Sequence, residues 1–260
     1  MKIKHWLLGA MLLPSLSFAA NVITKYTPPQ SEELKPYYEL LKSRNALDQV
    51  KPTVKLLKWP GDFTLETMEC GEVNAMYYPG QSRIVMCYEI FKDLHDKSEE
   101  QLTDYSAEYR RDVAVHAAIF LFRHELTHAI IDVFKVPIFT DEENAADAVA
   151  LYYSLNNSEP EELKKLLKGA KFYFMRKNPK FGETNDYQFG TFSDVHPLHE
   201  QRYFNMLCYT YAKYPKEADF LVKDGYLPQS RADYCPRQWE QLDNAMKKLI
   251  WPHTYKKVGK

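Results

Sequence analysis

The segment from residue 106 to residue 134 constrains the fold of this chain more than any other feature. Its apolar residues extend on both sides of its centre, and Pro137 follows its end, so the pattern predicts one long, buried helix. This helix nevertheless carries His124, Glu125 and His128. Polar groups left unpaired in such a helix would each cost several kcal/mol. The rest of the chain must therefore supply partners for these three side chains.

The order His124-Glu125-Leu126-Thr127-His128 places both imidazoles on one helical face, one turn apart. Both rings can reach one cation there, and Glu125 lies beside them, close to a water on that cation. This spacing is typical of zinc-dependent hydrolases. An alternative is a pair of structural core histidines, but it leaves Glu125 and the acidic residues that follow unexplained.

A catalytic zinc takes three protein ligands and leaves a fourth position for water. The metzincin pattern would require Gly at position 131 and His at position 134, where this chain has Ile131 and Phe134. The next predicted helix carries Glu143 and Asp147, which are four residues apart and share a face. We expect Glu143 to be the third ligand of one zinc ion per chain. Asp147 would accept the free ring N–H of a ligand histidine, His124.

Two alternatives to this ligand set remain at the level of sequence. Residues Thr140 to Glu143 could form a capping box, in which Glu143 binds the start of its own helix instead of a metal. Asp132 lies one turn beyond His128 and is a rival ligand, although helical drift carries it off the shared face.

The N-terminus has the pattern of a signal peptide. Lys2 and Lys4 precede an apolar run over residues 6–16. The small residues Ser17 and Ala19 then occupy the two positions that a signal peptidase recognises. We expect cleavage after Ala19, with a buried N-terminal helix as the alternative. The run is too short to span a bilayer and no cysteine follows the cut to carry a lipid, so the protein should be exported to the periplasm or secreted.

Export changes the meaning of the cysteines, because an oxidising compartment permits disulfides. The chain has four, none with metal-binding CxxC spacing: Cys70, Cys87, Cys208 and Cys235. Four cysteines allow three pairings, and we prefer the local one, Cys70 with Cys87 and Cys208 with Cys235, because each closes a short loop. Buried free thiols are the alternative.

Composition narrows the class of protein. With 45% apolar and 27% charged residues the chain is an ordinary folded one, and we expect a single domain over residues 20–260. Its 34 basic and 35 acidic side chains give no attraction to phosphate, so nucleic acid is not an expected partner. No later segment is long and apolar enough for a membrane span.

Hydrophobic periodicity predicts an α+β fold, in which a small antiparallel sheet packs on a mostly helical body. We expect residues 20–30 to be a mobile N-terminal segment, or lead-in, ahead of the folded body. Residues 36–57 are expected to form two helices with an interruption near Pro52. Three strands are expected, with a turn at Pro79-Gly80: 63–68, 73–78 and 83–89. After the long helix, four more helices are expected: from 140 or 141 onward, 161–175, 197–214 and 236–249.

Several of these motifs together resemble those of a known family. The HELTH motif followed by EExxAD resembles the gluzincin branch of zincin metallopeptidases. Further segments are similar to a bacterial metallopeptidase family catalogued as a domain of unknown function: Cys70–Ala75, Cys87–Glu89, Asp194–His196 and Glu200–Arg202. The resemblance covers roughly residues 30–250. It implies a zincin-like fold and the hydrolysis of a peptide or protein substrate, without identifying that substrate.

The resemblance also implies roles for individual residues. Glu125 would act as the general base, and His196 or Arg202 would stabilise the oxyanion, with helix capping and ion pairing as their structural alternatives. Substrate would bind as an added strand along the predicted hairpin. Two other functions share these residues: a non-catalytic protein that keeps the scaffold to bind peptides, and a zinc hydrolase of non-peptide amides or esters. The intact Glu125 argues against the first.

Overall fold

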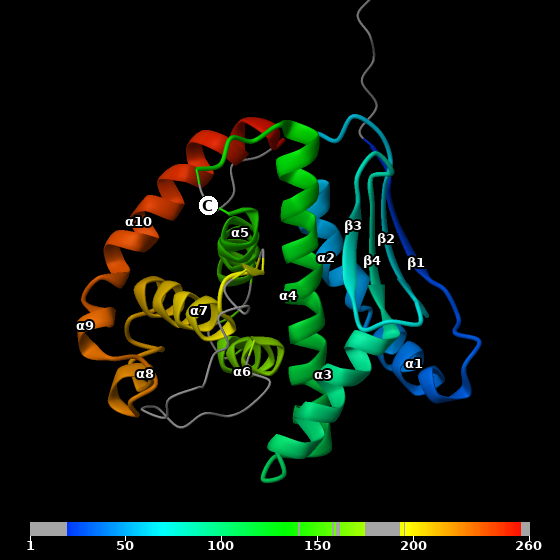
Figure 1. The fold of residues 1–260 in the computed structure, drawn as a ribbon, viewed down its shortest axis with the longest axis horizontal. Coiled ribbons are helices and arrows are strands. Elements are labelled where there is room, and N and C mark those ends of the chain that lie inside the picture. The colour runs from blue at the N-terminus through cyan, green and yellow to red at the C-terminus, as the bar shows by residue number, and fades with distance from the viewer. Residues whose placement is uncertain are drawn as a thin grey trace, which may run out of the picture.

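Helix α4 (Ala107–Phe134) runs through the middle of the molecule, with a small sheet on one side and most of the other helices on the opposite side (Figure 1). The computed structural model describes residues 20–139, 141–157, 159, 162–174, 193, 194 and 196–255. The expected signal peptide, residues 1–19, lies outside them. Ser106 begins α4 because its hydroxyl accepts the Tyr109 N–H at 3.2 Å, and Lys135 ends it in a left-handed conformation. The long buried helix expected from the sequence is confirmed.

Four strands of the described chain form one sheet, in the order β1-β2-β4-β3. They are β1 (Val22–Tyr26), β2 (Phe63–Met68), β3 (Ala75–Tyr78) and β4 (Arg83–Cys87). Only β3 and β4 pair antiparallel, since β1 pairs parallel to β2 and β2 pairs parallel to β4. The expectation of a three-stranded antiparallel sheet is therefore wrong in both strand number and direction. The expected mobile lead-in, residues 20–30, contains β1.

The α+β fold class is confirmed, with a helical body beside a small sheet (Figure 1). Besides α4, the described helices are α1 (Lys35–Ser43), α2 (Ala46–Lys55), α3 (Tyr88–Gln101), α5 (Glu142–Asn157), α6 (Leu163–Phe174), α7 (His199–Lys213), α8 (Phe220–Lys223), α9 (Gln229–Ala232) and α10 (Cys235–Ala245). Three short segments of the described chain are helices of other types: η1 (Glu32–Leu34) and η5 (Trp251–His253) are 3₁₀ helices, and η4 (Met246–Ile250) is a π-helix. Helices α5, α6, α7 and α10 lie close to their expected positions.

The end of one strand and the break between the first two α-helices differ from expectation, each for an identifiable reason. The strand expected to reach Glu89 stops at Cys87, because the chain turns directly into α3, whose buried Phe91 and Leu94 follow helical spacing. Helices α1 and α2 are separated at Asn45, which adopts a left-handed conformation with φ of 49°. Pro52, the expected break, lies inside α2.

Helix α4 is covered on two sides by different groups of side chains. One apolar cluster joins it to the sheet through residues such as Leu65 and Ile84, and a second joins it to α5, α6 and α7 through Phe120 and Leu151. Helix α6 approaches especially closely at Gly169, where a Cβ atom would lie 2.8 Å from the Val113 carbonyl oxygen. Burial on both sides fixes the positions of the buried α4 side chains, among them His124 and Glu125.

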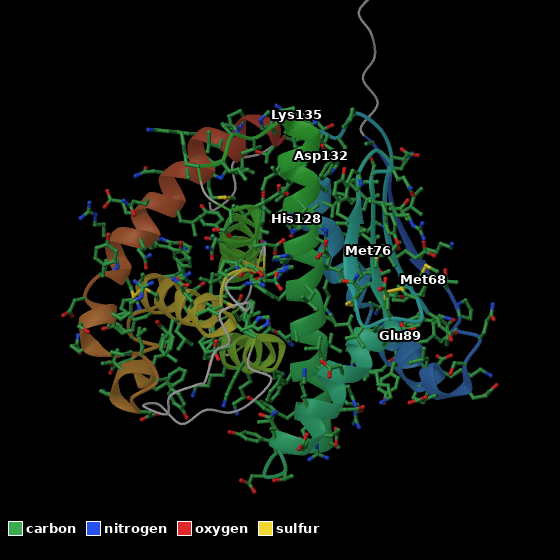
Figure 2. All side chains as sticks on the ribbon, in the orientation of Figure 1. Met68, Met76, Glu89, His128, Asp132 and Lys135 are labelled. Atoms are coloured by element: carbon green, nitrogen blue, oxygen red, sulfur yellow. A yellow bond between two sulfur atoms is a disulfide. The ribbon has the colours of Figure 1, made fainter. Side chains whose placement is uncertain are left out.

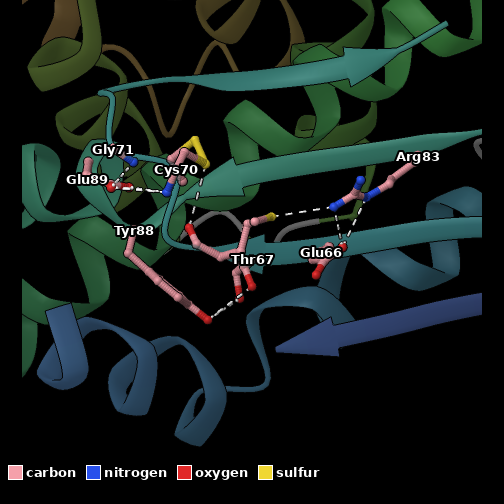
Figure 3. Close-up of a disulfide and its surroundings, with 9 residues drawn as sticks. Glu66, Thr67, Cys70, Gly71, Arg83, Tyr88 and Glu89 are labelled. Carbon is pink, nitrogen blue, oxygen red and sulfur yellow. Dashed lines mark hydrogen bonds and ion pairs between the residues drawn. A yellow bond between two sulfur atoms is a disulfide. The ribbon is translucent and has the colours of Figure 1, made fainter. Parts of the chain in front are cut away.

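All four cysteines are paired as the sequence favoured, Cys70 with Cys87 and Cys208 with Cys235. The first disulfide ties the chain ahead of β3 to the end of β4 (Figure 3). The carboxylate of Glu89 also accepts the backbone N–H groups of Cys70 and Gly71 there. The second joins α7 to the start of α10. No helix among the described residues has the length and apolar character needed to cross a bilayer.

Candidate metal centre

Helices α4 and α5 bring three potential metal ligands together, the two from the motif and one from the next helix. The Nε2 atoms of His124 and His128 are 3.1 Å apart. The carboxylate of Glu143 lies 3.2 Å from the first of these nitrogens and 3.5 Å from the second. Figure 2 shows His128 in the C-terminal part of α4, with Asp132 and Lys135 still nearer the end of the helix.

The spacing of these donors fits a zinc ion. Zinc binds nitrogen and carboxylate oxygen at about 2.0–2.1 Å in a tetrahedral arrangement, which sets neighbouring donors about 3.3 Å apart. Two imidazoles and one carboxylate are also the donor set of many catalytic zinc sites. The arrangement leaves room in a tetrahedron for one further ligand.

The opposite nitrogen of each ring explains why both Nε2 atoms are available. The Nδ1–H of His124 donates to Asp147 at 2.9 Å, and the Nδ1–H of His128 donates to Glu142 at 2.7 Å. Since a carboxylate only accepts, each neutral ring keeps its lone pair on Nε2. Two lone pairs and the Glu143 carboxylate then face one another, an arrangement that a shared cation stabilises.

Asp147 is itself held by Arg202 from α7. Arg202 donates from Nε at 2.6 Å and from Nη2 at 2.9 Å to the two carboxylate oxygens of Asp147. The Arg202 side chain is completely buried. Its Nη2 atom lies 3.8 Å from Glu143, so the guanidinium serves mainly to hold Asp147.

Glu125 faces the sheet. Its carboxylate accepts the backbone N–H of Tyr77 at 2.8 Å, and the hydroxyl of Tyr77 donates to Asp132 at 2.9 Å. Residue 77 belongs to β3, the strand at the edge of the sheet. Tyr77 therefore connects α4 to β3 at two points, and only 9% of Glu125 remains exposed.

The charges of the centre are strongly coupled. Burial lowers the pKa of His124, but hydrogen bonds to Asp147 and Glu143 outweigh burial and raise that pKa to about 9. Burial alone would raise the pKa values of Glu143 and Asp147, whereas their contacts with His124 and, for Asp147, Arg202 bring them below the ordinary range. Burial raises the pKa of Glu125, partly opposed by the two histidines. Without a metal, a proton on His124 supplies the positive charge that the carboxylates require.

His196 lies at the mouth of the centre, in the segment before α7. Its Nε2 atom is 3.2 Å from Glu143, and its Nδ1 atom is 3.0 Å from Asp194. A cleft of about 850 Å³ opens here, bounded by β3 and its preceding loop, α3, α4, α5 and residues 194, 196–200 and 202. His124, Glu125, His128 and Glu143 all line this cleft.

The structure thus brings the sequence-predicted residues to one place and adds two that the sequence analysis missed. The first is Glu142, whose carboxylate accepts the Nδ1–H of His128; its position beside Glu143 was the available signal. Nothing in the local sequence marks Tyr77, because its contribution is a backbone N–H.

Two alternative roles remain to be compared with the structure: Asp132 as a metal ligand, and Glu143 as a cap of its own helix. Asp132 lines the cleft, but its carboxylate contacts the Tyr77 hydroxyl and Lys135. The first turn of α5 is capped by Asp141, which accepts the Asn144 N–H at 2.8 Å. Thr140, the other member of the expected capping box, lies outside the described residues, while the Glu143 carboxylate faces the histidines.

Comparison with known proteins gives one match. A family model with the description "Putative metallopeptidase" matches residues 26–250, which include both helices of the centre. This is the kind of family that the motifs resembled. No curated protein and no solved structure matches the chain.

Proposed function

Because the chain belongs to this metallopeptidase family, we propose that it is an exported zinc-dependent peptidase. One observation carries the proposal, the meeting of the His124, His128 and Glu143 donor atoms at 3.1–3.5 Å from one another. When bound among them, zinc supplies a Lewis acid that polarises a carbonyl and brings the pKa of water toward about 7.

Glu125 is the proposed general base. Its Oε2 atom is held by the Tyr77 N–H, so Oε1 is the oxygen directed to accept a proton from the attacking water. The same oxygen then returns that proton to the nitrogen of the leaving amine. Burial raises the pKa of this carboxyl, which makes it a stronger base than an exposed glutamate.

The outer edge of β3 is the proposed place for an extended peptide. The Cys87 N–H donates to the Asn74 carbonyl, and in an antiparallel pair such bonded positions alternate. The backbone groups of Ala75 and Tyr77 consequently point away from β4, toward the cleft. In this proposal a substrate strand pairs with the Ala75 backbone and the Tyr77 carbonyl beside Glu125, because the Tyr77 N–H already donates to Glu125. This is the added strand that the sequence resemblance implied, with β3 and not β4 as the exposed edge.

His196 is the better placed of the two candidates for stabilising the oxyanion. Its side chain is 42% exposed at the cleft, with Nε2 beside Glu143. Arg202 is already engaged by Asp147 in the interior. We therefore assign the electrophile to His196 and a positioning role to Arg202.

Export is the remaining part of the proposal. The two disulfides are compatible with an oxidising compartment outside the cytoplasm. The N-terminal pattern ending at Ala19 supplies the expected signal. N-terminal sequencing of the mature protein from its native host should begin at Ala20.

Glu125→Gln tests the peptidase mechanism. The variant should keep zinc, since Glu125 is not a proposed ligand, and should lose peptide-library cleavage on the order of 10²–10⁴-fold because the base is gone. Zinc is measured by elemental analysis and cleavage by mass spectrometry of the library. Cleavage equal to the wild type would exclude the proposed mechanism. Absence of cleavage in the zinc-loaded wild type across broad libraries would favour a non-catalytic binding protein.

A comparison of two neighbouring glutamates tests the ligand set. Glu143→Ala should reduce zinc retention far more than Glu142→Ala, because the first removes a donor and the second only the partner of a ligand. Both variants remove one carboxylate from the same turn of α5, so each controls for the other. The reverse order in metal analysis would show that the ligand assignment is wrong.

A further inference from the structure

A second cavity lies beside α4 and shares no lining residue with the cleft of the metal centre. Its volume is about 330 Å³, and α2, α4, α5 and α6 all contribute to its walls. Pro52, Ile119 and Leu166 give it an apolar part. This is the size and character of a pocket for a small molecule.

Arg123 lines this cavity from α4 and is only 6% exposed. Its Nη1 atom donates to the Ser154 hydroxyl at 2.9 Å. Its Nε atom is buried without a hydrogen-bond partner, and within the described part of the chain no carboxylate lies within ion-pair distance. Buried charges in proteins are normally paired, and among the residues that the structure describes this guanidinium has no counterion. Burial accordingly lowers the pKa of Arg123 to about 10.

The other charged groups at the cavity do not satisfy Arg123. Glu162 is 48% exposed at the wall, and among the described residues its carboxylate lies 3.9 Å from the Nε2 atom of His116. Gln49, Thr53 and Asn157 add polar groups to the lining. From the described residues the cavity therefore combines an arginine without a carboxylate partner, an apolar surface and one acidic group that is already half in solvent.

We propose that this cavity binds a small organic carboxylate, with its oxygens on Arg123 and its apolar part against Ile119 and Leu166. A carboxylate matches the planar fork of a guanidinium and carries one charge. Inorganic phosphate carries more charge, has no apolar part, and would be repelled more strongly by Glu162.

Binding can be detected directly at Arg123. A buried Nε–H gives a resolvable signal in ¹H–¹⁵N correlation spectra, assigned by its loss in Arg123→Lys. Titration with isovalerate should shift this signal to saturation, whereas isoamyl alcohol, of similar shape but neutral, should not. An unshifted Arg123 signal at tens of millimolar isovalerate would overturn the proposal. A shift with inorganic phosphate but not with isovalerate would overturn the carboxylate assignment.

Variants away from Arg123 keep the test independent of folding at that position. Glu162→Gln removes the opposing charge and should tighten isovalerate binding about three- to tenfold, a gain that misfolding cannot produce. Glu240→Gln makes the same charge change on an exposed face of α10 and should leave the dissociation constant unchanged. Equal binding by wild type and Glu162→Gln would place the ligand elsewhere, for example at the metal centre, and would reject this cavity as its site.

Discussion

The two histidines of the metal centre are supported in contrasting ways. His124 belongs to an inner support, defined as His124, Asp147 and Arg202, whose side chains are 3%, 7% and 0% exposed. His128 belongs to an outer support, defined as His128 and Glu142, which are 17% and 44% exposed. Both supports hold an Nδ1–H with a carboxylate, but the inner one continues into a third helix, α7, through a buried arginine.

Because of this difference, we expect the two supports to contribute differently to folding and to metal binding. The inner support links α4, α5 and α7 through buried charges that water cannot replace, so we expect metal binding and folding to be coupled there. The outer support lies at the cleft, where water can satisfy His128 if Glu142 moves away. We therefore expect changes to the inner support to affect both stability and metal affinity, and changes to the outer support to affect mainly metal affinity, and only weakly.

The largest effect is expected from Arg202→Met. Removing the guanidinium leaves the buried Asp147 carboxylate with His124 alone, which should lower the free energy of unfolding by about 3–5 kcal/mol. Arg111→Met is the matched control, because Arg111 and its partner Glu108 are exposed and such pairs contribute about 1 kcal/mol or less. Urea unfolding of both variants measures the difference. Similar losses in the two would mean that the inner support is not a folding element.

Local spacing made part of this arrangement predictable. The pairs His124 with His128 and Glu143 with Asp147 each lie four residues apart on a helix, so a sequence pattern fixes which side chains share a face. The pairing between helices followed from the need of a buried helix for polar partners. The hydrogen bond from His124 to Asp147 has the geometry that this argument expected.

Contacts between distant segments were not predictable in the same way. The sequence marked Arg202 as a candidate for stabilising the oxyanion. Its burial against Asp147, however, depends on how α7 packs, which no local pattern encodes. The role of Tyr77 rests on a backbone group at a sheet edge. The short strand β1 was misread as a lead-in because its pairing with β2 is parallel and non-local, so no hairpin signal accompanies it.

An intermediate effect is expected from pH in the metal-free protein. The pKa of His124 is raised from 6.5 to about 9 in the folded state, so its contribution to stability is complete below pH 6.5 and is lost as the pH rises through 9. The lowered pKa values of Glu143 and Asp147 act at the other end, where stability is lost as the pH falls below about 4.

Unfolding of chelator-treated protein should therefore become easier by about 2–4 kcal/mol between pH 6.5 and 9. Zinc should abolish this alkaline loss, because a coordinated Nε2 carries no proton. His124→Gln, measured without metal, should show a much flatter profile over the same range. A metal-free wild type that is equally stable at both pH values would show that the inner support does not hold a proton in place of the metal.

The smallest effects come from changing the carboxylate partners while keeping their shape. Asp147→Asn should weaken zinc binding about 10- to 100-fold, because it replaces the charged acceptor that fixes His124 with a neutral amide and leaves Arg202 without its charge partner. Glu142→Gln should weaken it only about threefold or less, since water can accept from His128 at the exposed position. Competition with a calibrated chelator measures both constants, and unfolding of the zinc-free variants separates a loss of affinity from a loss of fold. An equal loss of zinc affinity in Glu142→Gln and Asp147→Asn would show that exposure does not distinguish the two supports. The feature that they share, one carboxylate on each Nδ1–H, would then account for their contribution to metal binding.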